Sequence, residues 1–273
     1  KELTSQEELQ LAIEHHQAGR LKEAEQVYSG VLRRDPLCAT AIHMLGVIAH
    51  QCRNNEIGAE LISRALAIAP DLAAAESNLG LCLRDLGRLE EAIQCYQRAL
   101  SIEPNFSIAY FNQGNALLDL GHPKEAVASF QSAIALVPDH ADSHLNLGNT
   151  FRDLGLQEDA ARSYRKASVL RPNDDTPKIN LGMALQGLGD LKGALSVFQS
   201  VNSGLALYKQ CICLLAFGEY DRFYELIETD AEKYRSHLGV AAASTFISHQ
   251  LNRPNPHPFC KNPLDFLRVY EDL

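Results

Sequence analysis

The chain has 273 residues, 46% of them hydrophobic, and a formal net charge of −9 at pH 7. The acidic balance, without a cluster of Lys or Arg, excludes a nucleic-acid-binding surface, because phosphate contacts need concentrated positive charge. No apolar run approaches the roughly 18 residues that span a bilayer, so we expect a cytoplasmic protein without membrane contact. Because the chain starts at Lys1 and not at Met, we expect it to be a piece of a longer protein.

Prolines recur along the chain with a period of 34 residues, at Pro36, Pro70, Pro104, Pro138 and Pro172. Four other features keep the same register: a small residue, a large apolar residue four positions later, a mid-repeat glycine and a pair such as Leu79 and Gly80. The small residues are Ala24, Gly58, Ala92, Ala126, Ala160 and Ala194, the large ones Tyr28, Ile62, Tyr96, Phe130, Tyr164 and Phe198, and the glycines Gly19, Gly87, Gly121, Gly155 and Gly189, with Arg53 as the departure. Such a period is typical of a helix-turn-helix repeat.

Each of these marks has a physical role. Proline lacks an N–H and restricts the residue before it, so it ends the second helix of each repeat. The glycine permits a left-handed backbone that reverses the chain between two helices. A ring such as Phe130 is predicted to fill the space between neighbouring hairpins. The polar residues that follow the prolines are predicted to start the next helix; they are Asp71, Asn105, Asp139 and Asn173.

The Leu-Gly, Gly, Ala, aromatic and Pro marks together resemble the tetratricopeptide repeat family. The resemblance implies an all-α fold, an α-solenoid in which helix hairpins stack into a right-handed superhelix. The array would cover residues 5–230, with full repeats at 5–38, 39–72, 73–106, 107–140 and 141–174. A sixth repeat begins near residue 175 and has a short second helix, because Gly218 follows Gly189 after only 29 residues. A degenerate seventh pair is predicted over residues 205–230, a capping helix over 231–251, and a Pro-rich linker or docking tail over 252–273.

The chain offers no catalytic constellation. Its seven cysteines are an odd number spread along predicted helices, which favours reduced and mostly buried thiols. Cys211 and Cys213 are two residues apart on a helix and face different ways, which is unsuitable for a shared metal. His140 and Asp142 formally resemble an iron-binding His-x-Asp pair, but they fall where a repeat begins, and we interpret them as a helix start. We therefore predict no metal site, no cofactor and no enzymatic activity for this chain.

Polar residues recur where the family lines its concave groove, which is on the first helix of each repeat. The sixth position of that helix holds Asn78, Asn112, Asn146 and Asn180, the ninth adds Asn115 and Asn149, and the thirteenth adds Asp85, Asp119 and Asp153. Steps of three and four residues keep these positions on one stripe. A carboxamide has donors and an acceptor, so a row of them suits the backbone of an extended peptide. The alternative is that the asparagines hydrogen-bond a neighbouring repeat.

The asparagine row resembles the tetratricopeptide arm of O-linked N-acetylglucosamine transferases, and the resemblance implies that these side chains hold a substrate backbone. A carboxylate clamp is excluded, because the fifth position carries no lysine. That position instead holds Phe111 and Leu145, an apolar strip predicted beside the asparagines, unless curvature of the array buries it.

The predicted function is a protein interaction module that binds an extended peptide or a partner helix in the groove. One alternative is a substrate-recognition arm of a larger enzyme, either a glycosyltransferase or an oxygenase. Residues 255–266 resemble the junction of bacterial tetratricopeptide proteins that continue into a 2-oxoglutarate and iron oxygenase domain. A second alternative is self-association through the tail or a terminal repeat.

Overall fold

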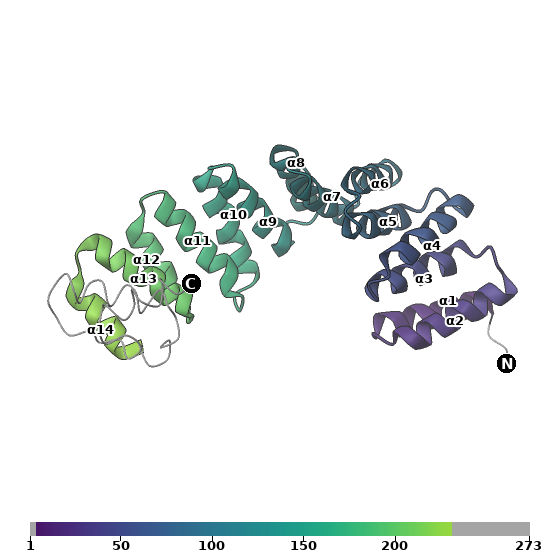
Figure 1. Cartoon of the computed structure of the whole chain (residues 1–273), viewed down its shortest axis with the longest axis horizontal. Helices are drawn as coiled ribbons and strands as arrows, with labels where there is room; N and C mark the ends of the chain where they lie inside the picture. Colours follow the sequence, from purple (N-terminus) through teal and green to yellow (C-terminus); the bar gives the residue numbers. More distant parts are fainter. Residues whose placement is uncertain (1–3, 231–273) are drawn as a thin grey trace, which may run out of the picture. The chain divides into compact units, whose positions relative to one another are not determined.

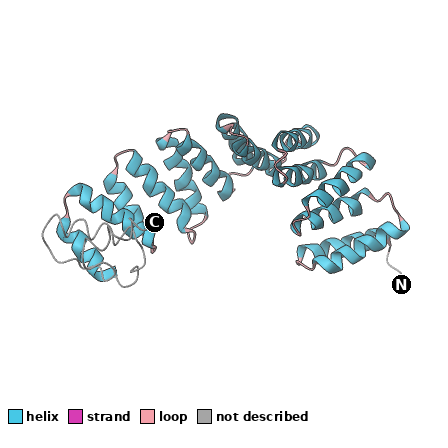
Figure 2. Ribbon diagram, in the orientation of Figure 1, coloured by secondary structure: helices cyan, strands magenta, loops and turns pink. Residues whose placement is uncertain are grey.

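The computed structural model describes residues 4–230, and within that range the chain is built of helices and loops alone (Figures 1 and 2). The predicted capping helix at 231–251 and the tail at 252–273 lie outside the described residues. The helices are α1 (Ser5–Gln17), α2 (Leu21–Arg34), α3 (Ala39–Gln51), α4 (Asn55–Ile68), α5 (Ala73–Asp85), α6 (Leu89–Ile102), α7 (Ser107–Asp119), α8 (Pro123–Leu136), α9 (Ala141–Asp153), α10 (Gln157–Leu170), α11 (Asp175–Gly187), α12 (Leu191–Gln199), α13 (Gly204–Phe217) and α14 (Tyr220–Asp230).

The helices pair into hairpins along the chain, as an all-α solenoid requires. First and second helices pack together in α1 and α2, α3 and α4, α5 and α6, and α7 and α8. The predicted short second helix of the sixth hairpin is confirmed, since α12 has 9 residues where α10 has 14. The degenerate last pair is present as α13 and α14, and Phe223 is fully buried.

The chain divides into two compact units, an N-terminal unit that ends at Ser143 and a C-terminal unit that begins at His144. The boundary falls within α9, and each unit is described by itself. In the N-terminal unit α5 packs against α3 before it and α7 after it. First helices of successive hairpins therefore lie side by side, and we call the surface that they form in either unit the A-helix face.

Prolines such as Pro104 sit in turns between hairpins. The residue after the proline also belongs to the turn, so the next helix begins one residue later than predicted. The N–H of Phe106 donates to the carbonyl of Glu103 (3.2 Å), so Pro104 and Asn105 occupy the two corners of a turn. The residue that caps α7 is therefore Phe106, and Leu72 and Asp174 likewise cap α5 and α11. The prediction that Asp71, Asn105 and Asn173 start these helices was wrong, because the turn takes those residues as its corner.

The glycine and the ring that recur along the repeats pack against each other within a hairpin. A Cβ added at Gly80 would lie 2.6 Å from Cε1 of Tyr96, and one at Gly148 would lie 2.7 Å from Cδ1 of Tyr164. Both rings are fully buried. The ring thus packs on the first helix of its own hairpin. The prediction that the ring fills the space between hairpins did not include this contact. Close packing of this kind explains the Leu-Gly pair.

The mid-repeat glycines end the first helices in the left-handed conformation, as predicted. Gly87 has φ +75° and Gly155 has φ +78°. At the same register of the second hairpin stands Arg53, with φ 65°, a conformation that costs a residue with a Cβ about 1–2 kcal/mol. None of the helices between residues 4 and 230 is both long and apolar enough to cross a bilayer.

Candidate functional site

On the A-helix face of the N-terminal unit, side chains 35 residues apart bond to one another. Three of these bonds join the last turns of successive first helices: His16 Nε2 to Gln51 Oε1 (2.9 Å), His50 Nε2 to Asp85 Oδ2 (3.1 Å) and Arg84 Nε to Asp119 Oδ2 (2.6 Å). The repeat is 34 residues long, so two side chains 35 residues apart lie side by side on successive first helices. Asp85 and Asp119, which the sequence assigned to a peptide groove, thus have partners in the preceding hairpin.

Asn78 is joined in the same way to the buried imidazole of His43. The amide nitrogen of Asn78 donates to Nε2 of His43 at 2.9 Å, and His43 is only 8% exposed. Burial lowers the pKa of His43 from its ordinary 6.5 to about 4, so the imidazole is neutral at pH 7 and its Nε2 accepts a hydrogen bond. Asn78 therefore holds α5 against α3.

Asn112 stands at the same register one repeat later, but its surroundings differ. The residue 35 positions before it is Ser77, whose side chain is much shorter than an imidazole. Ser77 is 2% exposed and Asn112 is 7% exposed, and among residues 4–230 neither side chain has a hydrogen-bonding partner. The polar atoms of both side chains keep some contact with solvent, unlike the buried hydroxyl of Tyr96. The Ser77 and Asn112 pair is thus a polar site between α5 and α7 whose hydrogen bonds are unused.

The aromatic residue beside this pair is packed on two sides. The ring of Phe111 lies 6.0 Å from the ring of Phe130 and makes an edge contact of 5.0 Å with His140. Phe111 and Leu145 are both partly buried, and Leu145 packs against the core of the C-terminal unit. Phe111 and Leu145, the residues of the predicted apolar strip, each pack against other side chains, so only part of each is exposed to a ligand.

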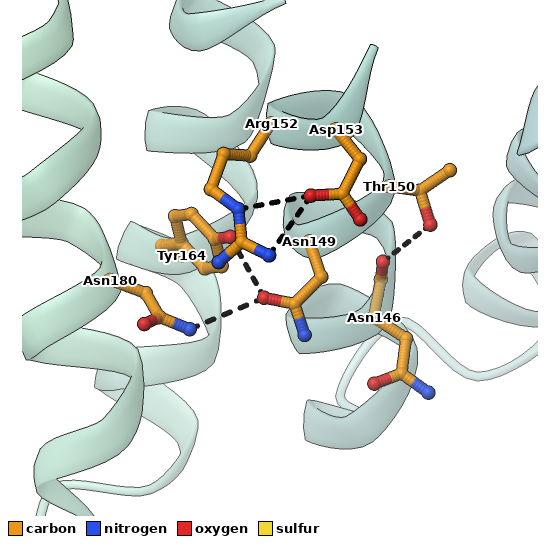
Figure 3. A network of polar contacts seen from close by, with 7 residues as sticks. All are labelled: Asn146, Asn149, Thr150, Arg152, Asp153, Tyr164 and Asn180. Carbon is orange, nitrogen blue, oxygen red and sulfur yellow. Dashed lines mark hydrogen bonds and ion pairs between the residues drawn. The ribbon is translucent and has the colours of Figure 1, made fainter. Parts of the chain in front are cut away.

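The C-terminal unit carries a polar network around Asn149, which Figure 3 shows. Oδ1 of Asn149 accepts from the hydroxyl of Tyr164 (2.8 Å) and from the amide nitrogen of Asn180 (3.2 Å). Tyr164 belongs to α10 and Asn180 to α11, so one carboxamide joins three helices. Asn149 and Asn180 therefore hold each other in place.

The other predicted residues of these helices are more accessible. Asp153 is exposed and accepts from its neighbour Arg152 through Nε (3.1 Å) and Nη2 (3.0 Å) (Figure 3). The backbone oxygen of Asn146 accepts from Thr150 (2.7 Å). Asn115 on α7 and Asn146 on α9 are both partly buried.

Sequence reasoning missed the residues that decide the state of each asparagine. The fifth position of the first helices was considered only for lysine or an apolar strip, although His43 and Ser77 stand there, beside Asn78 and Asn112 on the next helix. The signal that would have found them is the residue 35 positions before Asn78 and before Asn112; Asn180 follows another spacing, since its partner Asn149 lies 31 positions earlier. A similar rule holds for the tyrosines, because the residue 15 positions before Tyr164 is Asn149. Before Tyr96 it is Leu81, and the buried hydroxyl of Tyr96 has no partner.

The cysteines and histidines do not assemble a reactive or metal-binding centre in the described part of the chain. No group of three or more His, Cys, Asp or Glu between residues 4 and 230 is placed to hold a metal ion. Burial raises the pKa of Cys95 to about 11 and that of Cys211 to about 12, so both are protonated thiols at pH 7. His140 precedes α9, and its Nδ1 receives the hydroxyl of Ser143 at 2.6 Å, which confirms its interpretation as a helix start.

The stacked hairpins and their lateral side-chain bonds define a helical repeat protein of the α-solenoid class. Models of the tetratricopeptide repeat match residues 9–73, 73–106 and 111–175, which together make up more than half of the chain. The chain therefore belongs to the tetratricopeptide repeat family, and it is by class a protein interaction module. A search of curated proteins finds no match.

Solved structures show the same fold. PilF of Pseudomonas aeruginosa has 21% sequence identity and a TM-score of 0.66, over 80% of this chain and 96% of that one. PilW, described as a widely conserved type IV pilus biogenesis factor, has 22% identity and a TM-score of 0.64, over 73% and 92% of the two chains. YrrB, described as a TPR protein with an unusual peptide-binding site, has 24% identity and a TM-score of 0.52, over 62% and 88%.

Proposed function

We propose that the chain binds an extended peptide of a partner protein on the A-helix face, and that Ser77 and Asn112 make the polar contacts in the N-terminal unit. The observation that carries the proposal is that both side chains are buried and without a partner among the described residues. A carboxamide offers donors to a peptide C=O and an acceptor to a peptide N–H, and a serine hydroxyl offers both. A bound backbone would replace solvent as the hydrogen-bonding partner of these two side chains.

The surroundings of this pair favour binding that depends little on peptide side chains. Asp119 on α7 is paired with Arg84, and Glu76, which precedes Ser77, is paired with Arg98, so these charges offset each other. Asn115 lies one turn after Asn112 on α7 and extends the same stripe. The remaining predicted residues, among them Asn146, Asp153 and Leu145, are proposed contacts on the A-helix face of the C-terminal unit. Asn149 and Asn180 position each other and are proposed to act as scaffold.

A selection from a library of random unstructured peptides, displayed on phage and panned on the full chain, tests this proposal. We expect Asn112→Ala to weaken binding of selected peptides by about 0.5–1.5 kcal/mol, or two- to tenfold in Kd, measured by fluorescence anisotropy. Asn78→Ala is the matched control. It removes the same side chain at the same register of the preceding hairpin, where the carboxamide is already hydrogen-bonded to His43. Selected peptides that bind Asn112→Ala as tightly as the parent chain would contradict the proposal.

The family match does not favour the two alternatives, an enzyme's recognition arm and self-association. The residues behind the oxygenase resemblance, 255–266, lie outside the described residues. YrrB supports the proposal by its described peptide-binding site, at the level of shared fold. A cytoplasmic location and the absence of nucleic-acid and membrane partners stay predictions from the sequence.

A further inference from the structure

A second concave feature of the N-terminal unit lies between the second helices of two hairpins. A groove of about 420 Å³ is bordered by α4 and α6 and has α5 as its floor. We call it the B-helix groove and define it by Ala59 and Glu60 on α4, Leu79 and Leu83 on α5, and Cys95 and Arg98 on α6. None of the residues proposed above for peptide binding lines it, so the groove is independent of the proposed function.

Two small residues keep this groove open. Ala59 lies in the wall on α4, and the same register of the next two second helices holds the larger Ile93 and Val127. Ile93 is partly buried and packs against the core of its hairpins. On the opposite wall stands Cys95, where the preceding second helix has Leu61. The small side chains of Ala59 and Cys95 thus favour an open groove at this pair of hairpins.

Leu79 and Leu83 lie at the base of the groove and are largely buried, so the apolar area that they offer there is small. The whole groove, at about 420 Å³, is within the range of ligand pockets, so it has room for one or two side chains of a partner. The lining of α4 runs from Glu56 to Ser63, which corresponds to about 10 Å of helix at 1.5 Å per residue. A partner element of about two helical turns matches that length.

The two walls of the groove differ in whether their charged side chains form ion pairs within the chain. On α6, Arg88 donates to Glu91 through Nε (2.7 Å) and Nη2 (2.6 Å), and Arg98 donates through Nε to the buried Glu76 (2.8 Å). Both arginines are therefore committed to carboxylates of this chain.

On α4, Glu56 and Glu60 are exposed, and neither has an ion pair with any of the described residues. They are one turn apart, and like charges at that spacing repel. The groove therefore presents the small apolar surface of Leu79 and Leu83 beside two carboxylates that form no ion pair with the described residues.

We propose that the B-helix groove docks a basic amphipathic helix of a partner protein. Its aliphatic side chains lie on Leu79 and Leu83, and two Lys or Arg residues one turn apart pair with Glu56 and Glu60. The cationic side chains offset the repulsion between the two glutamates, so the complementarity is electrostatic as well as apolar. Because the glutamates are exposed, the electrostatic part weakens as ionic strength rises.

Two synthetic peptides test this docking site on the full chain. One has about 14 residues with Leu and Lys at helical spacing, and the other carries Glu in place of every Lys. We expect the Leu/Lys peptide to bind and the Leu/Glu peptide to bind at least about tenfold more weakly, measured by isothermal titration calorimetry. Ala59→Ile, which installs the residue that the next hairpin already tolerates, should weaken the Leu/Lys peptide by about tenfold.

Glu56→Gln with Glu60→Gln is the second variant, and it changes no volume in the groove. It should weaken the Leu/Lys peptide several-fold and remove most of the salt dependence. The matched control is Glu90→Gln, an exposed glutamate at the register of Glu56 one hairpin later, which should leave binding unchanged. Binding that is unaffected by the double variant, or equally weakened by Glu90→Gln, would show general attraction to an acidic surface and overturn the proposal, as would equal binding of both peptides.

Discussion

The contact between α3 and α5 and the contact between α5 and α7 are built at the same register of the repeat, yet they use it differently. In the first, the buried imidazole of His43 accepts a hydrogen bond from Asn78. In the second, Ser77 and Asn112 are buried without partners among residues 4–230. Asn78 and Asn112 stand at the same register of the repeat, and the residue 35 positions earlier, His43 or Ser77, separates an asparagine with a hydrogen bond to the preceding helix from one without it.

The largest effect tests the register on which this comparison depends. Leu147 is 6% exposed and belongs to the Leu-Gly pair of its hairpin. Leu147→Ala should lower the free energy of unfolding by about 2–5 kcal/mol, because it leaves a cavity in a packed core. Urea denaturation measures the loss, with Leu156→Ala as control, since Leu156 is 46% exposed and should lose much less. Equal losses in the two variants would mean that the assigned register is wrong.

The next largest expected effect concerns the buried imidazole of His43, which lies in the contact between α3 and α5. The pKa of His43 is lowered from 6.5 to about 4, so between these values the unfolded chain binds a proton that the folded chain does not. The free energy of unfolding should therefore be highest above pH 6.5 and fall as the pH drops toward 4, by up to about 3 kcal/mol from this group.

His43→Gln should flatten that pH dependence. The measurement is urea denaturation of the parent chain and of His43→Gln at pH 7 and pH 5. The other histidines titrate in both proteins, so only the difference between the two slopes reports on His43. Parallel slopes would show that the imidazole of His43 is solvated in the folded chain.

A smaller effect tests the same logic on the tyrosines. Tyr164→Phe removes the hydrogen bond to Asn149 and should cost about 1 kcal/mol. Tyr96→Phe removes a buried hydroxyl that has no partner, so its stability should stay unchanged or rise. The two melting temperatures should thus shift in different directions or by clearly different amounts. A similar decrease in both variants would mean that the hydroxyl of Tyr96 is hydrogen-bonded in solution.

The smallest effect lies at the hairpin turns. Arg53 takes the left-handed conformation that glycine has at the same register of other hairpins. Arg53→Gly should raise the free energy of unfolding by about 0.5–1 kcal/mol, because relief of the left-handed strain exceeds the added entropy of the unfolded glycine. Gly87→Ala, at the same register, is the opposite change and should destabilise the chain. Thermal melting of both variants gives the comparison.

Much of the fold could be predicted from the sequence, because the repeat marks are local. The helix pairs, the left-handed turns at Gly87 and Gly155 and the short α12 all follow from glycine, proline and hydrophobic spacing. The helix starts at Asp71 and Asn105 were wrong because a Pro-Asx pair is used as a turn corner, which propensity alone does not distinguish from a cap.

The site was harder to predict, because its state depends on contacts between helices. Asn78 and Asn112 are identical by residue type and by position within the repeat. They differ in the side chain that lies beside each of them on the preceding helix. That neighbour is defined only by the packing of α5 against α3 and α7. The same holds for the B-helix groove, whose opening depends on Ala59 and Cys95 on two different second helices.

The most direct test compares the free energies of unfolding of Asn78→Ala and Asn112→Ala in urea at pH 7. Asn78→Ala should lose about 1–3 kcal/mol, since it breaks the bond to a buried imidazole and leaves that imidazole unpaired. Asn112→Ala should change the free energy of unfolding little, since it breaks no hydrogen bond to another described residue. Equal losses in the two variants would contradict the account, because they would show that both asparagines are structural bonds.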